Sequence, residues 1–557
     1  MDRRTFVRTG TATAATALFM TDSLWATNPH EADTVLRGAL VYDGLGNPPV
    51  EVDVALQGSR IAGVGRSLSA SGARVVDLRG LALAPGFVDI HSHTDLVLLV
   101  DPRAESKIRQ GVTTEVVGQD GSSIGPWRPE DARRRAESYR EQYGVDFDFR
   151  DLGGFFRTLD ERGMALNLAS MVGQGTVRDF VIGHDDRPAT AEEVERMREV
   201  VREALATGAC GISSGLEYTP SGFADTDELA ALAEVLSGSG LPYASHMRNE
   251  DDRLMAAVEE AVMVGRRSGA PVQISHLKAQ GGRNWWKTDP VLRTISGARE
   301  AGVDVKFDVY PYIAYSTGLA NLFPVSARDG GTEAFLARLR DDDTRARLEV
   351  GVRDKIDQLG SWDAVQITSS GSEALRWAEG RRLGALAGER EEDPFDLLVR
   401  LLIEDRNRTR MVGFGMSEEN VAAKLAHPLA IVCSDGGARA VSGPLSEGTP
   451  HPRAYGAFPR VLGHFVRDLG ALSMEDAILK MTSRPADRLK LAGRGRIEPG
   501  AFADLVAFDP DRVADRATFE EPHQYPEGIP HVWVNGRQVI REGEQSGELP
   551  GRVVRPS

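Results

Sequence analysis

The sequence has almost no cysteine, no long apolar run and no basic stripe, and each absence excludes a class of protein. Only Cys210 and Cys433 occur among 557 residues. They lie far apart in apolar runs, so we expect two buried thiols and no disulfide framework. No run of apolar residues is long enough to span a bilayer, so we expect no stable membrane anchor. Basic residues do not interleave with aromatic ones, and we therefore expect no nucleic-acid partner.

The composition is that of an acidic globular protein with more than one domain. Asp and Glu number 82 against 66 Lys and Arg, which gives a formal net charge of −16. The hydrophobic share of 41% and the charged share of 27% are ordinary for a folded soluble chain. The length predicts two or three domains. An anionic substrate would need local positive charges to overcome the repulsive overall field.

The N-terminus reads MDRRTFVRTG and continues into a short run of small and apolar residues, TATAATALFM. Arg3 and Arg4, followed by Phe6, resemble a twin-arginine export signal. We expect residues 1–26 to be this signal, with cleavage near Ala26, and the mature protein to be periplasmic or extracellular. The alternative is a cytoplasmic tail.

Two β-rich segments flank a longer middle segment. Residues 31–85 and 494–557 contain short runs of alternating and β-branched residues punctuated by glycine, such as TVLRGALVYDG and HVWVNGRQVIREG. Because both segments have this strand-and-turn pattern, we predict one small β-sandwich domain formed from both termini.

The middle segment, residues 86–493, alternates strand candidates with helical periodicity. Eight such strands with intervening helices predict an α/β fold, a parallel (β/α)₈ TIM-like barrel. The gap between the seventh and eighth candidates is too long for one crossover helix, so we expect an inserted subdomain at about residues 318–428. The eight candidates are GFVDIHSH (86–93), GVTTEVVG (111–118), ALNLASMV (165–172), CGISSGL (210–216), PYASHMR (242–248), PVQISHLK (271–278), DVKFDVYP (304–311) and LAIVCSDG (429–436).

Several of these strand candidates end in side chains that bind metals. His91 and His93 would share one strand face, because residues i and i+2 point the same way. The carboxyl ends of barrel strands meet at one mouth, where such enzymes build their active sites. Four histidines and two carboxylates would therefore converge there, and neutral imidazole is a common metal ligand. These residues are His91, His93, Glu217, His246, His276 and Asp435.

Motifs along nearly the whole chain after the export signal resemble the amidohydrolase superfamily. PGFVDIHSHTD, SHMRNE, QISHLKAQG and CSDG are similar to the superfamily's metal-binding motifs. GLEYTPSGFADTDEL, HPRAYGAFPRVLG and PHQYPEGIPHVWVNG are similar, more narrowly, to its N-acyl-D-amino-acid deacylase (D-aminoacylase) branch. The resemblance implies a barrel with a terminal β-sandwich and one or two zinc ions per chain.

The resemblance also implies roles for individual residues. His91, His93 and Asp435 would hold one metal, and His246 and His276 a second. D-aminoacylases place a metal-binding cysteine after the second strand, in a stretch like VVGNCG, whereas this chain reads VVGQDG and has Asp120 there. We therefore predict Glu217 as the carboxylate that bridges the two metals, with Asp120 as the alternative.

The implied reaction is hydrolysis of an N-acyl-D-amino acid to a carboxylate and a D-amino acid. Zinc lowers the pKa of bound water from about 15.7 towards about 7 and polarises a carbonyl group. Asp435 would accept the proton of the attacking water and deliver it to the departing nitrogen. The substrate-binding residues implied by the resemblance are Tyr218, Lys278, Ser316 and Arg453.

Two other readings stay open from the sequence. A dipeptidase or cyclic-amide hydrolase could use the same scaffold and the same ligands on a peptide-like substrate. A metal-free binding or scaffold protein would lack ligands, and none of the five expected histidine and aspartate ligands is missing.

Overall fold

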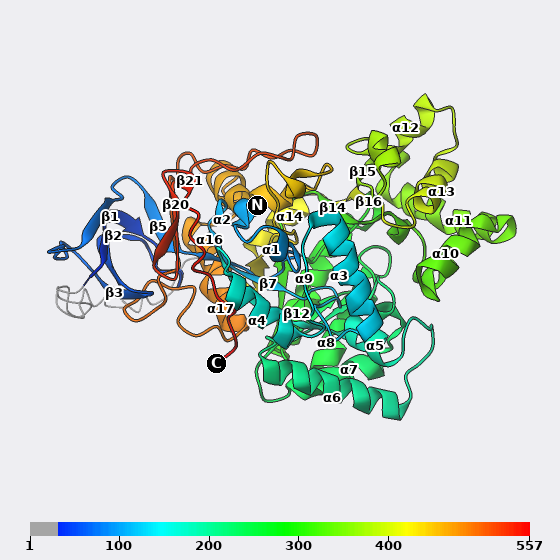
Figure 1. Cartoon of the computed structure of the whole chain (residues 1–557), viewed down its shortest axis with the longest axis horizontal. Helices are drawn as coiled ribbons and strands as arrows, with labels where there is room; N and C mark the ends of the chain where they lie inside the picture. The colour runs from blue at the N-terminus through cyan, green and yellow to red at the C-terminus, as the bar shows by residue number, and fades with distance from the viewer. Residues whose placement is uncertain (1–31) are drawn as a thin grey trace, which may run out of the picture.

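A computed structural model describes residues 32–557, so the predicted export signal lies outside the described residues. Figure 1 shows three parts along the longest axis of the molecule. A β-sheet lies at one end, a body of parallel strands and helices occupies the middle, and a mainly helical insertion lies at the other end.

The sheet at the end of the molecule joins both ends of the chain. Strand β5 pairs parallel with β1 from the N-terminal segment and antiparallel with β18 from the C-terminal segment. Leu36 and Ala39, which lie on either side of an irregularity in β1, are buried in one cluster with Leu83, Leu505 and Trp533 from the other strands. The nine strands are β1 (Thr34–Val41), β2 (Val50–Gln57), β3 (Arg60–Gly65), β4 (Arg74–Asp77), β5 (Ala82–Pro85), β18 (Leu505–Phe508), β19 (His531–Val534), β20 (Arg537–Arg541) and β21 (Glu544–Gln545).

The middle of the molecule is built on parallel strands in chain order. One sheet holds β6 (Phe87–Asp89), β7 (Val112–Val117) and β8 (Asn167–Ser170). The other holds β9 (Val172–Gly173), β10 (Ile212–Gly215), β11 (Tyr243–His246), β12 (Val272–Ile274), β13 (Val305–Val309) and β17 (Ala430–Val432). Met171 alone separates β8 from β9, and a parallel bridge between Ser92 and Gly436 connects the opposite margins of the two sheets. The predicted α/β class with parallel strands is confirmed. The hydrogen bonds between strands form two separate sheets, however, and not one closed barrel.

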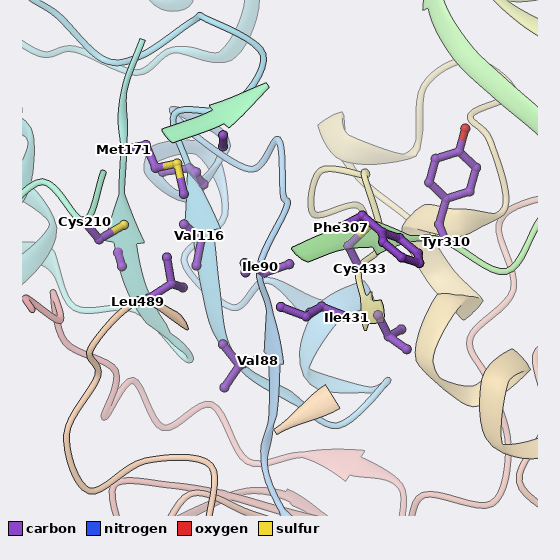
Figure 2. Close-up of a cluster of buried hydrophobic side chains, with 14 of the residues drawn as sticks. Val88, Ile90, Val116, Met171, Cys210, Phe307, Tyr310, Ile431, Cys433 and Leu489 are labelled. Atoms are coloured by element: carbon purple, nitrogen blue, oxygen red, sulfur yellow. The ribbon is translucent and has the colours of Figure 1, made fainter. Parts of the chain in front are cut away.

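These strands are buried on both faces, although several of them carry polar residues, such as Glu115 in β7 and Ser213 in β10. Figure 2 shows Val88, Val116 and Ile431 from β6, β7 and β17 in one hydrophobic cluster with Phe307 from β13. Cys210 and Cys433 also lie in the interior and are free, as expected of buried thiols.

Amphipathic helices cover the strands. In α6 a capping box between Thr190 and Glu193 satisfies the first turn, and Met197, Val200 and Val201 are buried at helical spacing. No helix among residues 32–557 is long and apolar enough to cross a membrane. The helices of the middle part are α1 (Val97–Val100), α2 (Glu105–Ile108), α3 (Pro129–Tyr143), α4 (Leu152–Arg162), α5 (Gln174–Val181), α6 (Ala191–Thr207), α7 (Thr226–Ala233), α8 (Leu254–Ser268), α9 (Thr288–Glu300), α14 (Glu418–Ala426), α15 (Arg453–Arg460), α16 (Met474–Met481) and α17 (Ser483–Arg488).

The insertion between β13 and β17 has a hydrophobic core of its own, which includes Phe335, Leu336, Leu398 and Met411. Its three strands pair antiparallel in the order β14, β16, β15. The elements are β14 (Ala314–Gly318), α10 (Gly331–Arg340), α11 (Asp342–Leu359), β15 (Val365–Ser369), α12 (Leu383–Glu389), α13 (Pro394–Glu404) and β16 (Arg410–Phe414).

Candidate metal centre

Most of the predicted ligands lie just beyond the strands. Strand β6 ends at Asp89, so His91 and His93 belong to the following turn, and the prediction that they share a strand face is wrong. His276 follows the end of β12 with a left-handed backbone (φ 33°), and Asp435 follows β17 with φ 52°. Only His246 closes its own strand, β11. These side chains therefore come together because of the turns that follow the strands, and not because of side-chain alternation along the strands.

A first set of donor atoms comes from the loops after β6, β7 and β17. Asp435 Oδ1 lies 3.1 Å from His93 Nε2 and 3.5 Å from His91 Nε2. Asp120 closes the set, with Oδ1 3.4 Å from His91 Nε2 and Oδ2 3.5 Å from His93 Nε2. Four side chains thus present donor atoms to one point.

A second set shares Asp120 with the first. Asp120 Oδ1 lies 3.4 Å from His276 Nε2, and Asp120 Oδ2 lies 3.7 Å from His246 Nδ1. The two histidine nitrogens are 2.9 Å apart. Both oxygens of Asp120 therefore face both sets.

The unpaired atoms of this cluster fit metal ions. Both ring nitrogens of the fully buried His91 and Oδ1 of Asp120 make no hydrogen bond. Ligands bound tetrahedrally at zinc distances are about 3.4 Å apart, close to the spacings in both sets. Burial lowers the pKa of His91, but Asp120, Asp308 and Asp435 raise it to about 10, so the pocket favours a positive charge at this point. Nitrogen and oxygen donors of this kind suit zinc.

The outer ring nitrogens of the histidines face other carboxylates. Glu217 Oε2 lies 3.4 Å from His246 Nε2, the nitrogen that points away from Asp120. Glu250 Oε1 lies 3.1 Å from His276 Nδ1, and Asp308 Oδ1 lies 3.5 Å from His91 Nδ1. Carboxylates in such positions orient a histidine ligand and raise its basicity. Glu217, predicted as the bridge, therefore lies outside the space between the two sets, where Asp120 lies.

The backbone explains the position of Asp120. The residue has φ 53°, a left-handed conformation that follows the end of β7, and Gly121 N donates to Ser213 Oγ at 3.1 Å. Gly215 on β10 approaches so closely that an added Cβ would lie 2.0 Å from the Asp120 carbonyl oxygen. A glycine at this position of β10 therefore lets the loop turn Asp120 towards the histidines.

The predicted substrate-binding residues line a cavity of about 1370 Å³ above the donor sets. Arg453 donates to Asp435 Oδ2 at 2.5 Å and to the Ser316 carbonyl oxygen at 3.4 Å. Lys278 is buried and donates to Glu250 Oε1 at 2.7 Å. The ring of Tyr218 lies 4.7 Å from that of His246. Burial raises the pKa of Asp435, whereas Arg453 and the neighbouring histidines lower it well below its usual range.

A buried ion network that the sequence did not reveal lies beneath the first donor set. Lys107 on α2, Asp89 and Glu115 have no exposed surface. Lys107 Nζ lies 2.9 Å from Asp89 Oδ2 and 2.9 Å from Glu115 Oε1, and it donates to the Gly436 carbonyl oxygen at 2.6 Å. The network thereby connects the ends of β6, β7 and β17, which carry the ligands. Burial lowers the pKa of Lys107, but the two carboxylates raise it above its ordinary value, so the lysine is charged.

We expect Lys107→Met to weaken both the fold and the first donor set. Removing one partner of a buried ion pair costs about 3–5 kcal/mol, because the remaining charge is left uncompensated. Thermal unfolding should shift to a lower temperature, and zinc titration against a chelator should show weaker binding. Lys306→Met is the control, since Lys306 reaches only the partly exposed Asp304, at 4.0 Å. Unchanged zinc affinity in Lys107→Met would contradict the positioning role.

The family model described as "Amidohydrolase family" matches residues 74–305 and 419–540, which include all the donor residues. The chain belongs to the amidohydrolase family. The unmatched gap between these ranges contains the whole insertion and most of β13, whereas the matched ranges contain the ligand-bearing loops, the other parallel strands and part of the terminal sheet.

Relatives with named activities match this amidohydrolase over nearly its whole length. D-aminoacylase from Alcaligenes xylosoxydans xylosoxydans is 36% identical over 94% of this chain and 97% of its own. N-acyl-D-aspartate deacylase from the same organism is 37% identical over 95% and 96%. The crystal structure of N-acyl-D-glutamate deacylase from Bordetella bronchiseptica, complexed with zinc and a phosphonate inhibitor, has a TM-score of 0.79 and 33% identity, covering 94% of this chain and 100% of its own.

These comparisons confirm the predicted resemblance and the hydrolase class. The amidohydrolase of this sequence is similar to D-aminoacylases in sequence and in structure, and its histidine and aspartate groups form possible metal sites. Similarity to such structures also supports a TIM-barrel-like arrangement of the parallel strands.

Proposed function

We propose that the protein is a zinc-dependent hydrolase of N-acyl-D-amino acids, releasing a carboxylate and a D-amino acid. The observation that carries the proposal is the pair of donor sets sharing Asp120 at the floor of a large cavity. The named activities of the relatives support the substrate class. We also propose Asp120, and not Glu217, as the carboxylate common to both sets.

The chemistry divides between the metal and the side chains of this chain. Zinc, when held by these residues, supplies a Lewis acid that activates water and polarises the amide carbonyl. Asp435 is ionised because Arg453 and the histidines lower its pKa, so it can accept a proton from the attacking water. The same proton then passes to the amide nitrogen as the C–N bond breaks, which leaves a carboxylate and an amine.

Two side chains of the cavity orient the substrate. Arg453 uses one arm of its guanidinium on Asp435, and its planar fork suits an α-carboxylate beside the reacting carbonyl. Tyr218, whose hydroxyl lies 3.3 Å from Thr317 Oγ1, forms the opposite wall next to His246. Burial raises the pKa of this tyrosine well above its ordinary value, so its hydroxyl remains a hydrogen-bond donor.

The test combines metal content with turnover by the purified chain. We expect zinc to bind and N-acetyl-D-amino acids to be hydrolysed much faster than their L enantiomers. About two zinc ions per chain would support a shared Asp120, and about one would retain the reaction without the second site. Turnover of dipeptides or cyclic amides in place of N-acyl-D-amino acids would overturn the proposed substrate class.

The finer organisation and the location of the chain are proposals as well. We propose one (β/α)₈ barrel within residues 86–493, interrupted by the insertion at about 318–428, and a terminal domain of residues 31–85 and 494–557. The chain order of the parallel strands and the bridge between Ser92 and Gly436 support the barrel. The pair Arg3–Arg4 supports export to the periplasm or beyond, which cell fractionation and N-terminal sequencing would test.

A further inference from the structure

Two arginines in the wall of the cavity, Arg410 and Arg439, have no acidic partner among residues 32–557. Five other cations of this wall have acidic partners. Arg128 and Arg328 donate to backbone or amide oxygens, and Arg135 lies over the ring of Trp127. Among the lining cations of the described residues, Arg410 and Arg439 are the two whose side chains have no ion pair, hydrogen bond or ring contact. The paired examples are Arg134 with Asp131, Lys355 with Asp251, Lys278 with Glu250, Arg406 with Glu333 and Arg453 with Asp435.

Arg410 stands at the edge of the insertion that faces the cavity. It begins β16, opposite Gly318 on β14 and Ser369 on β15. Residues directly opposite each other in antiparallel strands share a face, and so does Ser316, two residues before Gly318. A Cβ added at Gly318 would meet nothing within 4 Å, so there is open space beside Gly318 on the strand face that it shares with Arg410. Ser316, Gly318 and Ser369 all line the same cavity.

The positive charges gather at this point. Arg410 keeps exposed surface at the cavity wall. Partial desolvation there lowers its pKa, the neighbouring charges of Arg439 and Arg453 lower it further, and Tyr218 and Asp435 oppose them. Arg453 is engaged by Asp435, but Arg410 and Arg439 make no side-chain hydrogen bond or ion pair within the described chain. Such a cluster is repulsive until an anion binds between its members.

We propose that Arg410 and Arg439 form a second anion subsite that binds an additional carboxylate of the substrate. The inference rests on the proposed function, in which the first carboxylate lies at Arg453. The second carboxylate belongs to the amino-acid side chain or to the acyl group, and in both cases the substrate is a dicarboxylate. Guanidinium forks match carboxylate geometry, and charge-assisted hydrogen bonds are the stronger ones.

The test compares charged substrates with neutral ones of the same shape on the zinc-loaded full chain. N-acetyl-D-glutamate against N-acetyl-D-glutamine tests the side chain, and N-succinyl-D-glutamine against N-succinamoyl-D-glutamine tests the acyl group. We expect kcat/KM to favour the charged member of one pair by about 30-fold, as for one charge-assisted contact. Arg410→Gln should reduce this preference to below about threefold, and Arg410→Lys, which keeps the charge without the fork, should give an intermediate value. Arg340→Gln, an exposed arginine at the end of α10 outside the cavity, should leave the preference unchanged.

Failure of the subsite and failure of the proposed function give different results. Turnover of N-acyl-D-amino acids without any charge preference, or a preference that survives in both Arg410→Gln and Arg439→Gln, would overturn the subsite alone. Absence of all turnover would overturn the proposed function, and calorimetry would then test the subsite separately. Glutarate should bind about tenfold more tightly than its monoamide, and Arg410→Gln should abolish the difference; equal affinities would overturn the subsite.

Discussion

Asp435→Asn is expected to lower kcat by about 10³-fold while the protein stays folded, since general acid–base catalysis typically contributes 10²–10⁴-fold. The amide has nearly the same shape as the carboxylate and keeps one oxygen for a metal, but it cannot accept the proton of the attacking water. Steady-state kinetics on N-acetyl-D-amino acids measures the loss, and circular dichroism checks the fold. Retention of most of the activity would refute the assigned role.

Metal content separates the proton-transfer role of Asp435 from its role as a ligand. If zinc content in Asp435→Asn stays near that of the unaltered chain, the loss of rate reports the missing base. A modest fall in Tm is expected, because buried Arg453 loses its charged partner at 2.5 Å. Asp179→Asn is the matched control: this carboxylate lines the same cavity but pairs with His184 at 3.3 Å, away from the donor sets. It should change kcat by less than about threefold.

The strands and the histidines could be predicted because their signals are local. Short runs rich in β-branched residues, such as VTTEVV and AIV, mark strands, and a polar residue directly after such a run lies at the mouth of a parallel barrel. His246, for example, needs only the end of β11 to be placed. The prediction that His91 and His93 share a strand face is wrong, since β6 ends at Asp89, yet the turn brings both side chains to Asp435.

The shared ligand and the supporting network could not be predicted, because they depend on contacts between distant segments. Asp120 faces the histidines only through a left-handed backbone and the close approach of Gly215, 95 positions away in the chain. Lys107 lies in a four-residue helix whose sequence, ESKI, gives no sign of a buried charge. Arg410 reaches the cavity from the insertion, where strand order cannot be read from periodicity.

Asp120→Ala is expected to reduce zinc to one ion per chain or fewer and to lower kcat/KM by two orders of magnitude or more. The reason is geometric: Asp120 is the one residue common to both donor sets, with oxygens 3.4–3.7 Å from nitrogens of His91, His276 and His246. Without it the second set keeps only two histidines, and zinc sites in proteins normally hold at least three protein ligands. Elemental analysis and competition with a chelator measure the two changes.

Glu217→Gln and Asp120→Cys decide between the two candidate carboxylates. Glu217 reaches only the outer nitrogen of His246, so Glu217→Gln should keep both metals with slightly weakened affinity. Loss of one metal in Glu217→Gln, with both retained in Asp120→Ala, would reverse the assignment.

Asp120→Cys supplies a thiolate, the ligand that D-aminoacylases have at this position in a stretch like VVGNCG, and should restore metal binding. After cobalt substitution, a thiolate charge-transfer absorption should then be present in Asp120→Cys and absent from the unaltered chain, because neither Cys210 nor Cys433 belongs to a donor set or lines the cavity. That absorption requires direct coordination at position 120, so it tests the shared position of Asp120 independently of activity.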